Sequence, residues 1–140
     1  MYSIKTEHSF DSAHFLSGYD GKCSNIHGHR WRVIIEVNSE DVQKAGQARG
    51  MLVDFSTLKD DLKQEVDSLD HALIIEKNSI STMLLKLLKE ENFNIIELDF
   101  RPTAENIAKY FYDKLTTKGY KVKEATVYET PNNCATYSEV

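Results

Sequence analysis

The amino-acid sequence predicts an α+β domain in which an antiparallel sheet carries helices on one face. Polar and apolar residues alternate along 2–14 and 27–38, as expected of strands that bury one face. Apolar residues recur at helical spacing along 58–69 and 104–115. Repeats, low-complexity runs and linkers are absent from the 140-residue sequence, so we expect one domain spanning 1–140.

The first half of the chain supplies the longest predicted strands. The strand over 2–14 ends at His14, and a turn-rich loop over 16–22 leads into a second strand that begins near His27. The apolar stretch 51–55 is interpreted as a further strand.

Helix signals dominate the second half. Ser56 is expected to cap a helix that runs to the residue before Asp70, and a second helix over 80–88 precedes a short strand within 94–100. Thr103 is expected to cap a third helix that ends at Gly119. The last predicted strand, 121–130, places Ala125, Val127 and Glu129 on one face.

Composition limits the classes of function. The chain is 41% hydrophobic and 28% charged, which is typical of a soluble globular protein. Its net charge of −5 argues against a general nucleic-acid surface, which needs clustered Lys and Arg. The sequence shows neither a membrane-length apolar run nor a secretion signal, so we expect no membrane partner and a cytoplasmic location. Cys23 and Cys134 are expected to be reduced, with Cys134 structural or incidental.

A metal site is predicted where Cys23 precedes His27-Gly28-His29. Alternate side chains of a strand share a face, so His27 and His29 point the same way, on the face that continues with Trp31 and Val33. Two buried imidazoles without partners would each lose hydrogen bonds, whereas one divalent metal ion satisfies both. Zinc is the natural candidate, with His14 as a third ligand. The alternative is that the pair is simply two polar residues on a strand.

Five motifs occur in order along most of the chain: Phe10-x-x-Ala13-His14, Cys23-x-x-x-His27-Gly28-His29, Leu69-Asp70-His71, Pro102-Thr103-x-Glu105 and Glu129-Thr130. Together they resemble the 6-pyruvoyl-tetrahydropterin synthase family. The spacing of three residues between Cys23 and His27 looks most like its bacterial branch, the 6-carboxy-5,6,7,8-tetrahydropterin synthases of queuosine biosynthesis. The stretch between His71 and Pro102 looks longer than in compact members of this branch.

The resemblance implies a tunnelling fold (T-fold), in which three subunits close their sheets into a barrel and two trimers stack into a homo-oligomer. It implies a small-molecule substrate, 7,8-dihydroneopterin triphosphate, and release of acetaldehyde and triphosphate. A zinc ion on His14, His27 and His29 would act as a Lewis acid. We expect the pocket to lie between subunits, with the metal site and Asp70-His71 as two half-sites.

The remaining site residues each have two interpretations. Cys23 is either the catalytic base, since a thiol near a metal can be held as thiolate, or a fourth ligand of a closed structural site. Asp70 and His71 resemble the family's acid-base pair, and an Asp-His at a helix end is also common in structural roles. Glu129 fits an anchor for the pterin edge, whereas without the family it would be interpreted as a surface charge.

The Pro-Thr-x-Glu motif makes Thr103 and Glu105 candidate substrate-binding residues, although helix capping explains Thr103 equally well. Lys22, Arg30 and Arg32 are all candidates for contact with the triphosphate.

Three other functions remain open: 6-pyruvoyl-tetrahydropterin synthase activity, a non-catalytic zinc-stabilised module that binds pterins, and a small metal protein unrelated to pterins. The joint presence of Cys23 and His71 favours catalysis over binding alone.

Overall fold

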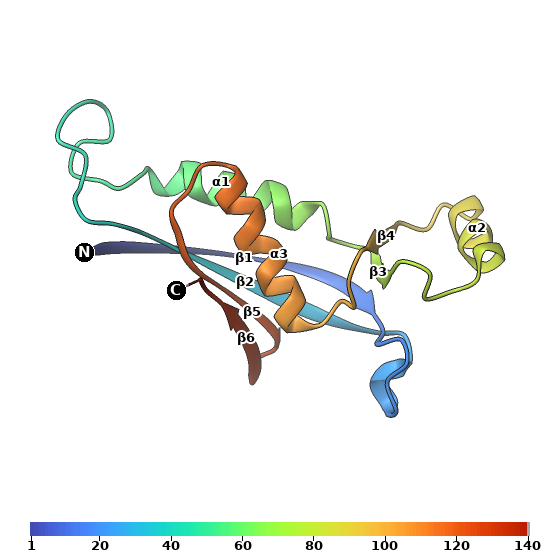
Figure 1. The fold of residues 1–140 in the computed structure, drawn as a ribbon. Coiled ribbons are helices and arrows are strands. Elements are labelled where there is room, and N and C mark those ends of the chain that lie inside the picture. The colour runs from blue at the N-terminus through green and yellow to red at the C-terminus, as the bar shows by residue number, and fades with distance from the viewer. Residues whose placement is uncertain (140) are drawn as a thin grey trace.

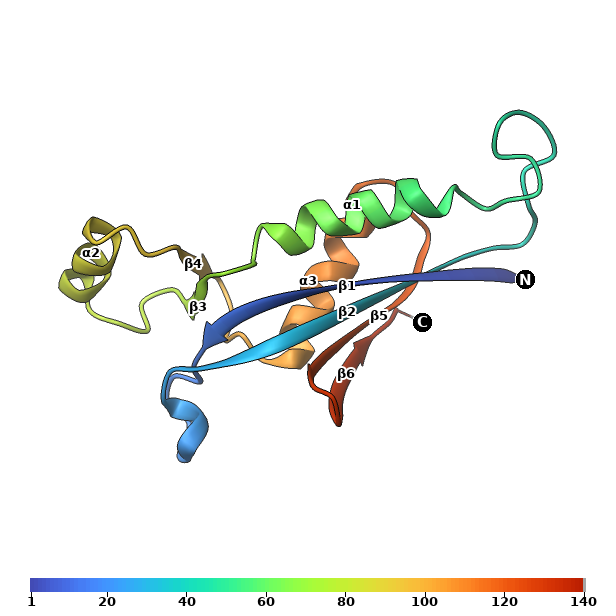
Figure 2. The ribbon, with the colours of Figure 1, turned by 180° about the vertical axis from the view of Figure 1, so that it is seen from behind.

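The computed structural model describes residues 1–139 and contains one six-stranded sheet in the order β4-β3-β1-β2-β5-β6. Its elements are β1 (Tyr2–His14), the 3-10 turn η1 (Lys22–Ser24), β2 (His27–Ser39), α1 (Phe55–Asp67), β3 (Leu73–Glu76), α2 (Thr82–Glu90), β4 (Ile95–Leu98), α3 (Ala104–Thr117), β5 (Val122–Thr130) and β6 (Asn133–Tyr137). The predicted α+β class is confirmed, and α1 and α3 lie over the same face of the sheet (Figures 1 and 2).

The long β1–β2 hairpin forms the centre of the sheet. The two strands pair antiparallel over their whole length, from Tyr2 opposite Ser39 to His14 opposite His27. β5 then pairs antiparallel with β2, and β6 with β5. This register brings the end of β1 and the start of β2 to one end of the sheet.

The core lies between this sheet and helices α1 and α3. Phe10 of β1 stacks on Trp31 of β2 with ring centroids 5.8 Å apart, and its ring lies 6.1 Å from that of Phe111 on α3. From α1 the buried side chains are Leu58, Leu62 and Val66. The predicted helical spacing therefore identified the faces that pack on the sheet.

The sheet is mixed, so the prediction of a wholly antiparallel sheet was wrong at one edge. β3 runs parallel to β1, with Ala13 opposite Leu73, and β4 runs parallel to β3. The segment that forms β3 was not predicted as a strand because it is a short apolar run without alternation. Such runs are typical of parallel strands buried on both faces. Strand β6 was also missed.

The predicted strand over 51–55 is a second error. This segment is irregular, and Phe55 already begins α1. The capping residue is Asp54, whose Oδ1 accepts a hydrogen bond of 2.8 Å from the backbone N–H of Ser56. Met51 and Phe55 are exposed, so the apolar pattern here does not reflect a buried sheet face.

Other local predictions are confirmed. Thr103 caps α3 by accepting a hydrogen bond from the Asn106 N–H at 3.2 Å, and Gly119 ends that helix with φ of +102°. The long stretch after His71 forms β3, α2 and β4, which extend from one end of the molecule (Figure 1).

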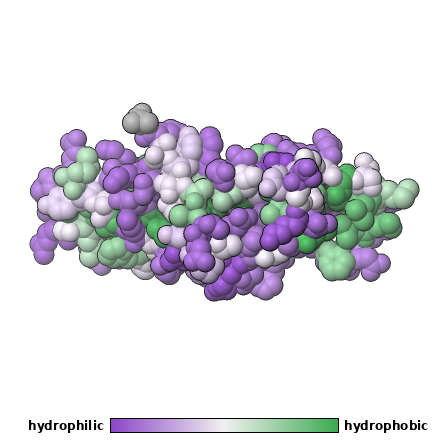
Figure 3. Space-filling model, turned by 90° about the horizontal axis from the view of Figure 1, so that it is seen from below, coloured by the Kyte–Doolittle hydropathy of each residue, from purple (hydrophilic) through white to green (hydrophobic). Residues whose placement is uncertain are grey.

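Helix α2 buries none of its own residues. Seen from below, hydrophobic residues gather at the end of the molecule that carries it (Figure 3). The large exposed apolar side chains of this region are Met83, Leu84, Leu87 and Phe93. Within residues 1–139, no helix combines the length and the apolar character needed to cross a membrane.

Replacing Phe111 with Ala is expected to lower the free energy of unfolding by about 3–5 kcal/mol, because a fully buried ring is removed and its cavity remains. Urea denaturation measures the change. The matched control is Phe93→Ala, which removes the same side chain from a position that is 62% exposed. An equal loss in the two variants would contradict the packing described above.

Candidate metal centre and active site

Three histidines meet at the end of the sheet where β1 finishes and β2 begins. His14 lies directly opposite His27, and His29 follows two residues later on the same face. The ring centroids of the three imidazoles are 4.6, 4.9 and 5.2 Å apart. The predicted convergence of these residues is therefore present in a single chain.

Backbone carbonyls orient two of the rings. The Nδ1 atom of His14 lies 2.7 Å from the carbonyl oxygen of Pro102, and Nδ1 of His27 lies 2.7 Å from that of Asn25. A carbonyl oxygen only accepts hydrogen bonds, so each Nδ1 carries the proton and donates it. In the neutral imidazole each Nε2 then presents a lone pair, which is the tautomer that a metal-binding histidine needs.

Glu129 of β5 completes the cluster. Its Oε1 atom lies 3.1 Å from His14 Nε2 and 3.4 Å from His29 Nε2. One ligand atom from each of His14, His27, His29 and Glu129 lies within 4.8 Å of all the others. Among residues 1–139, Nε2 of His14 and Nε2 of His29 are buried and find no hydrogen-bond partner. Four convergent donors with two orphaned nitrogens fit a bound metal ion.

The protonation states of the cluster also favour metal binding. Burial lowers the pKa of the His29 imidazole and so favours its neutral, metal-binding form. A neutral imidazole and a carboxylate are both ready to bind a cation without first losing a proton.

Cys23 lies in the turn η1 and is partly buried. Its backbone carbonyl accepts a hydrogen bond of 2.8 Å from the Leu16 N–H, which closes the loop between β1 and β2. Within residues 1–139, the group of convergent metal-ligating atoms contains Glu129 and not the thiol of Cys23. The geometry therefore gives no support to Cys23 as the fourth ligand.

Asp70 and His71 form a contact of their own in the turn after α1. His71 has φ of +52°, a left-handed conformation that bends the chain, and its Nδ1 lies 2.9 Å from Asp70 Oδ2. On an extended strand two neighbours would face opposite ways. The turn brings the carboxylate and the imidazole together, as the sequence required.

Strand β1 holds this turn in place through backbone and hydroxyl groups. The Asp11 N–H donates to Asp70 Oδ1 at 2.9 Å, and the His71 N–H donates to the Asp11 carbonyl at 2.7 Å. The buried hydroxyl of Ser12 donates to the Leu69 carbonyl and accepts from the Ala72 N–H. These hydrogen bonds from Asp11 and Ser12 form a clamp that fixes the Asp70-His71 turn at both ends.

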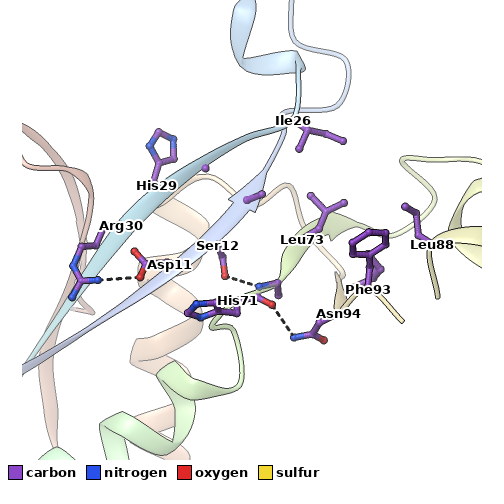
Figure 4. A pocket seen from close by; sticks show the side chains of 14 residues that line it. Asp11, Ser12, Ile26, His29, Arg30, His71, Leu73, Leu88, Phe93 and Asn94 are labelled. Carbon is purple, nitrogen blue, oxygen red and sulfur yellow. Dashed lines mark hydrogen bonds and ion pairs between the residues drawn. The ribbon is translucent and has the colours of Figure 1, made fainter. Parts of the chain in front are cut away.

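One residue of the metal cluster and one of the Asp-His pair line a common groove. A groove of about 860 Å³ is lined by both His29 and His71, together with Asp11, Arg30 and Phe93 (Figure 4). One residue from each of the two predicted half-sites thus lines this groove.

The basic candidates differ in their surroundings. Arg30 lines this groove and pairs with Asp11 at 3.0 Å. Arg32 stacks its guanidinium 4.1 Å from the ring centroid of Tyr128, beside a second groove that Glu129 also lines.

The Pro-Thr-x-Glu motif contributes in a way that the sequence did not reveal. The Thr103 hydroxyl caps α3, and Glu105 is exposed in the first turn of that helix. The contact with the histidine cluster comes instead from the carbonyl of Pro102. Pro102 and Ser12 were both missed because backbone acceptors and buried hydroxyls leave little signal in a sequence.

This fold and this cluster define a tunnelling-fold domain with a candidate metal site at the strand ends. A comparison with protein families gives its affiliation: the model of the family described as 6-pyruvoyl tetrahydropterin synthase matches residues 3–140. The chain belongs to this family.

Two relatives that align with nearly the whole chain support the same family. The chain is 37% identical to a 6-carboxy-5,6,7,8-tetrahydropterin synthase of Haemophilus influenzae, an alignment that covers 99% of this chain and 100% of the relative. A protein of the same name from Synechocystis is 31% identical over 98% of this chain and 93% of its own length.

Solved structures share the fold. An uncharacterized protein from Wolinella succinogenes superimposes with a TM-score of 0.79 at 22% identity, over 99% of this chain and 98% of the other. The 6-pyruvoyl tetrahydropterin synthase of Caenorhabditis elegans gives a TM-score of 0.69 at 24% identity, over 99% and 96%. The predicted fold is therefore confirmed for the single subunit.

Replacing Ser12 with Ala is expected to lower the free energy of unfolding by about 1–3 kcal/mol, because the partly buried Ala72 N–H and the Leu69 carbonyl lose their shared partner. Urea denaturation measures the loss. Ser68→Ala is the control, since it removes an exposed hydroxyl bonded only to the Glu65 carbonyl of its own helix end. Equal stability of the two variants would show that the Ser12 hydrogen bonds do not stabilise the Asp70-His71 turn.

Proposed function

We propose that this protein converts 7,8-dihydroneopterin triphosphate and water to 6-carboxy-5,6,7,8-tetrahydropterin, with release of acetaldehyde and triphosphate, as a zinc-dependent lyase of queuosine biosynthesis. The observation that supports the proposal most strongly is the groove shared by His29 of the metal cluster and His71 of the Asp-His pair. A metal ion and a proton-transfer pair beside one groove are what such a reaction requires. The relatives named 6-carboxy-5,6,7,8-tetrahydropterin synthase supply the choice of product.

In this proposal His14, His27 and His29 hold the zinc ion. Zinc, when bound, supplies Lewis-acid chemistry that stabilises negative charge developing on the substrate. Cys23 takes a proton from a carbon of the substrate side chain. Asp70 holds the imidazole of His71 in one tautomer, so that His71 exchanges a proton with the substrate.

Substrate recognition is assigned to the other end of the site. Glu129 anchors the amino and ring N–H groups of the pterin through its two carboxylate oxygens. Thr103 and Glu105 are retained as substrate-binding candidates on the strength of the family motif alone. Thr103 is already engaged as a helix cap.

We also propose a homo-oligomer, a dimer of trimers, and a cytoplasmic location. Within residues 1–139, β1 pairs on the side opposite β2 only at Ala13 and His14, where β3 joins it. Most of that edge of β1 is thus free to pair with another chain, as is the outer edge of β6.

The proposal is tested by incubating the purified protein with 7,8-dihydroneopterin triphosphate and identifying the pterin product by mass spectrometry. We expect 6-carboxy-5,6,7,8-tetrahydropterin together with acetaldehyde. A product that keeps its three-carbon side chain would show 6-pyruvoyl-tetrahydropterin synthase activity instead. Binding without any product would show a non-catalytic pterin-binding module.

Replacing Cys23 with Ala is expected to leave the zinc content unchanged and to reduce kcat by at least about 100-fold, since general-base catalysis typically contributes 10²–10⁴-fold. Metal analysis and product formation are measured on the same sample. Cys134→Ala, at the exposed cysteine of β6, is the control and should match the wild type. Wild-type turnover in Cys23→Ala would dismiss its role as base.

A further inference from the structure

The contact between His14 and Glu129 is chemically unusual. His14 Nδ1–H donates a hydrogen bond to the Pro102 carbonyl, so in the neutral imidazole Nε2 presents a lone pair. The atom that faces this lone pair at 3.1 Å is Glu129 Oε1, and this Nε2 makes no hydrogen bond. Two acceptors held this close repel each other. A cation between them removes the repulsion.

Glu129 stands in the same relation to a second histidine. Its Oε1 lies 3.4 Å from Nε2 of His29, which is also buried without a hydrogen-bond partner. Zinc bonds of about 2.0–2.2 Å in a tetrahedral site set neighbouring ligand atoms about 3.3–3.6 Å apart. The two separations at Glu129 are close to this spacing. One oxygen thus occupies a position suited to a ligand.

The far side of Glu129 is open. Its side chain is 30% exposed and lines a second groove, of about 460 Å³, together with Arg32, Tyr128 and Pro131. The Glu129 carboxylate therefore contacts the metal cluster and is still accessible from solvent, so a bound pterin can compete with the metal for it.

We propose that Glu129 is the fourth metal ligand of the free protein and that it leaves the metal when substrate binds. The inference rests on the proposed function, because it gives Glu129 two successive roles at that site. In the free protein its carboxylate closes a three-histidine, one-carboxylate site. On substrate binding the carboxylate dissociates with its charge unchanged and becomes available to the pterin edge.

This arrangement has a direct consequence for the metal. A carboxylate ligand adds a negative charge and a bond, so its removal weakens zinc binding. An anchor that touches only substrate would leave zinc affinity unchanged. Zinc affinity in the absence of substrate therefore separates the two roles of Glu129.

The test compares Glu129→Gln with Glu124→Gln, which changes a carboxylate on the same strand, outside the metal-ligating group. Zinc affinity is measured by competition with a chromophoric chelator, without substrate. We expect the Kd for zinc to rise at least about tenfold in Glu129→Gln, since even outer-shell changes cost 10–100-fold, and to stay at the wild-type value in Glu124→Gln. Equal affinities in wild type and Glu129→Gln, or a wild type that binds no zinc, would overturn the inference.

Displacement is tested on the wild-type protein loaded with Co²⁺, which needs no variant to fold. Adding neopterin is expected to change the visible ligand-field spectrum, because the carboxylate leaves the metal. A pterin that binds without changing this spectrum, or no binding at all, overturns the displacement step. The outcome is independent of the product assay: a protein can hold zinc through Glu129 and still make a different product.

Discussion

The register between β1 and β2 is the constraint on which the site depends. It places His14 opposite His27 and thereby brings three imidazoles to one end of the sheet. A slip of one residue would move the side chains of one strand to the other face and separate His14 from its partners. The register is held by the core below it, where Phe10 packs on Trp31. The packing of the core thus fixes the positions of the three imidazoles at the end of the sheet.

Four consecutive residues of β1 connect this register to the proposed proton-transfer pair. Asp11 and Ser12 clamp the turn that carries Asp70 and His71, while His14 belongs to the metal cluster. The distance between the two parts of the site is therefore set by one extended strand rather than by a mobile loop. Rigid support of this kind is what a site needs if a metal ion and an acid-base pair are to act on one substrate.

Much of this arrangement could be predicted from local pattern. Alternation along β1 and β2 identified the shared face of His27 and His29, and helical spacing identified the buried faces of α1 and α3. The parallel pairing of β3 could not be predicted, because Leu73 to Ile75 is a short apolar run whose partner is decided by tertiary contacts. The position of Glu129 was predicted on an inward face, but its approach to His14 and His29 depends on the pairing of β5 with β2. Long-range pairing leaves no local signal in either case.

The central claim is that a zinc ion binds where the lone pairs of His14, His27 and His29 converge. X-ray absorption at the zinc edge of the purified protein tests it most directly, because nitrogen and oxygen ligands lie at about 2.0–2.2 Å and sulfur at about 2.3 Å. We expect a first shell of nitrogen and oxygen alone, with the outer-shell scattering of imidazole rings. A spectrum without imidazole scattering would contradict the claim, and a sulfur scatterer from Cys23 would contradict the assignment of the remaining ligand to an oxygen atom.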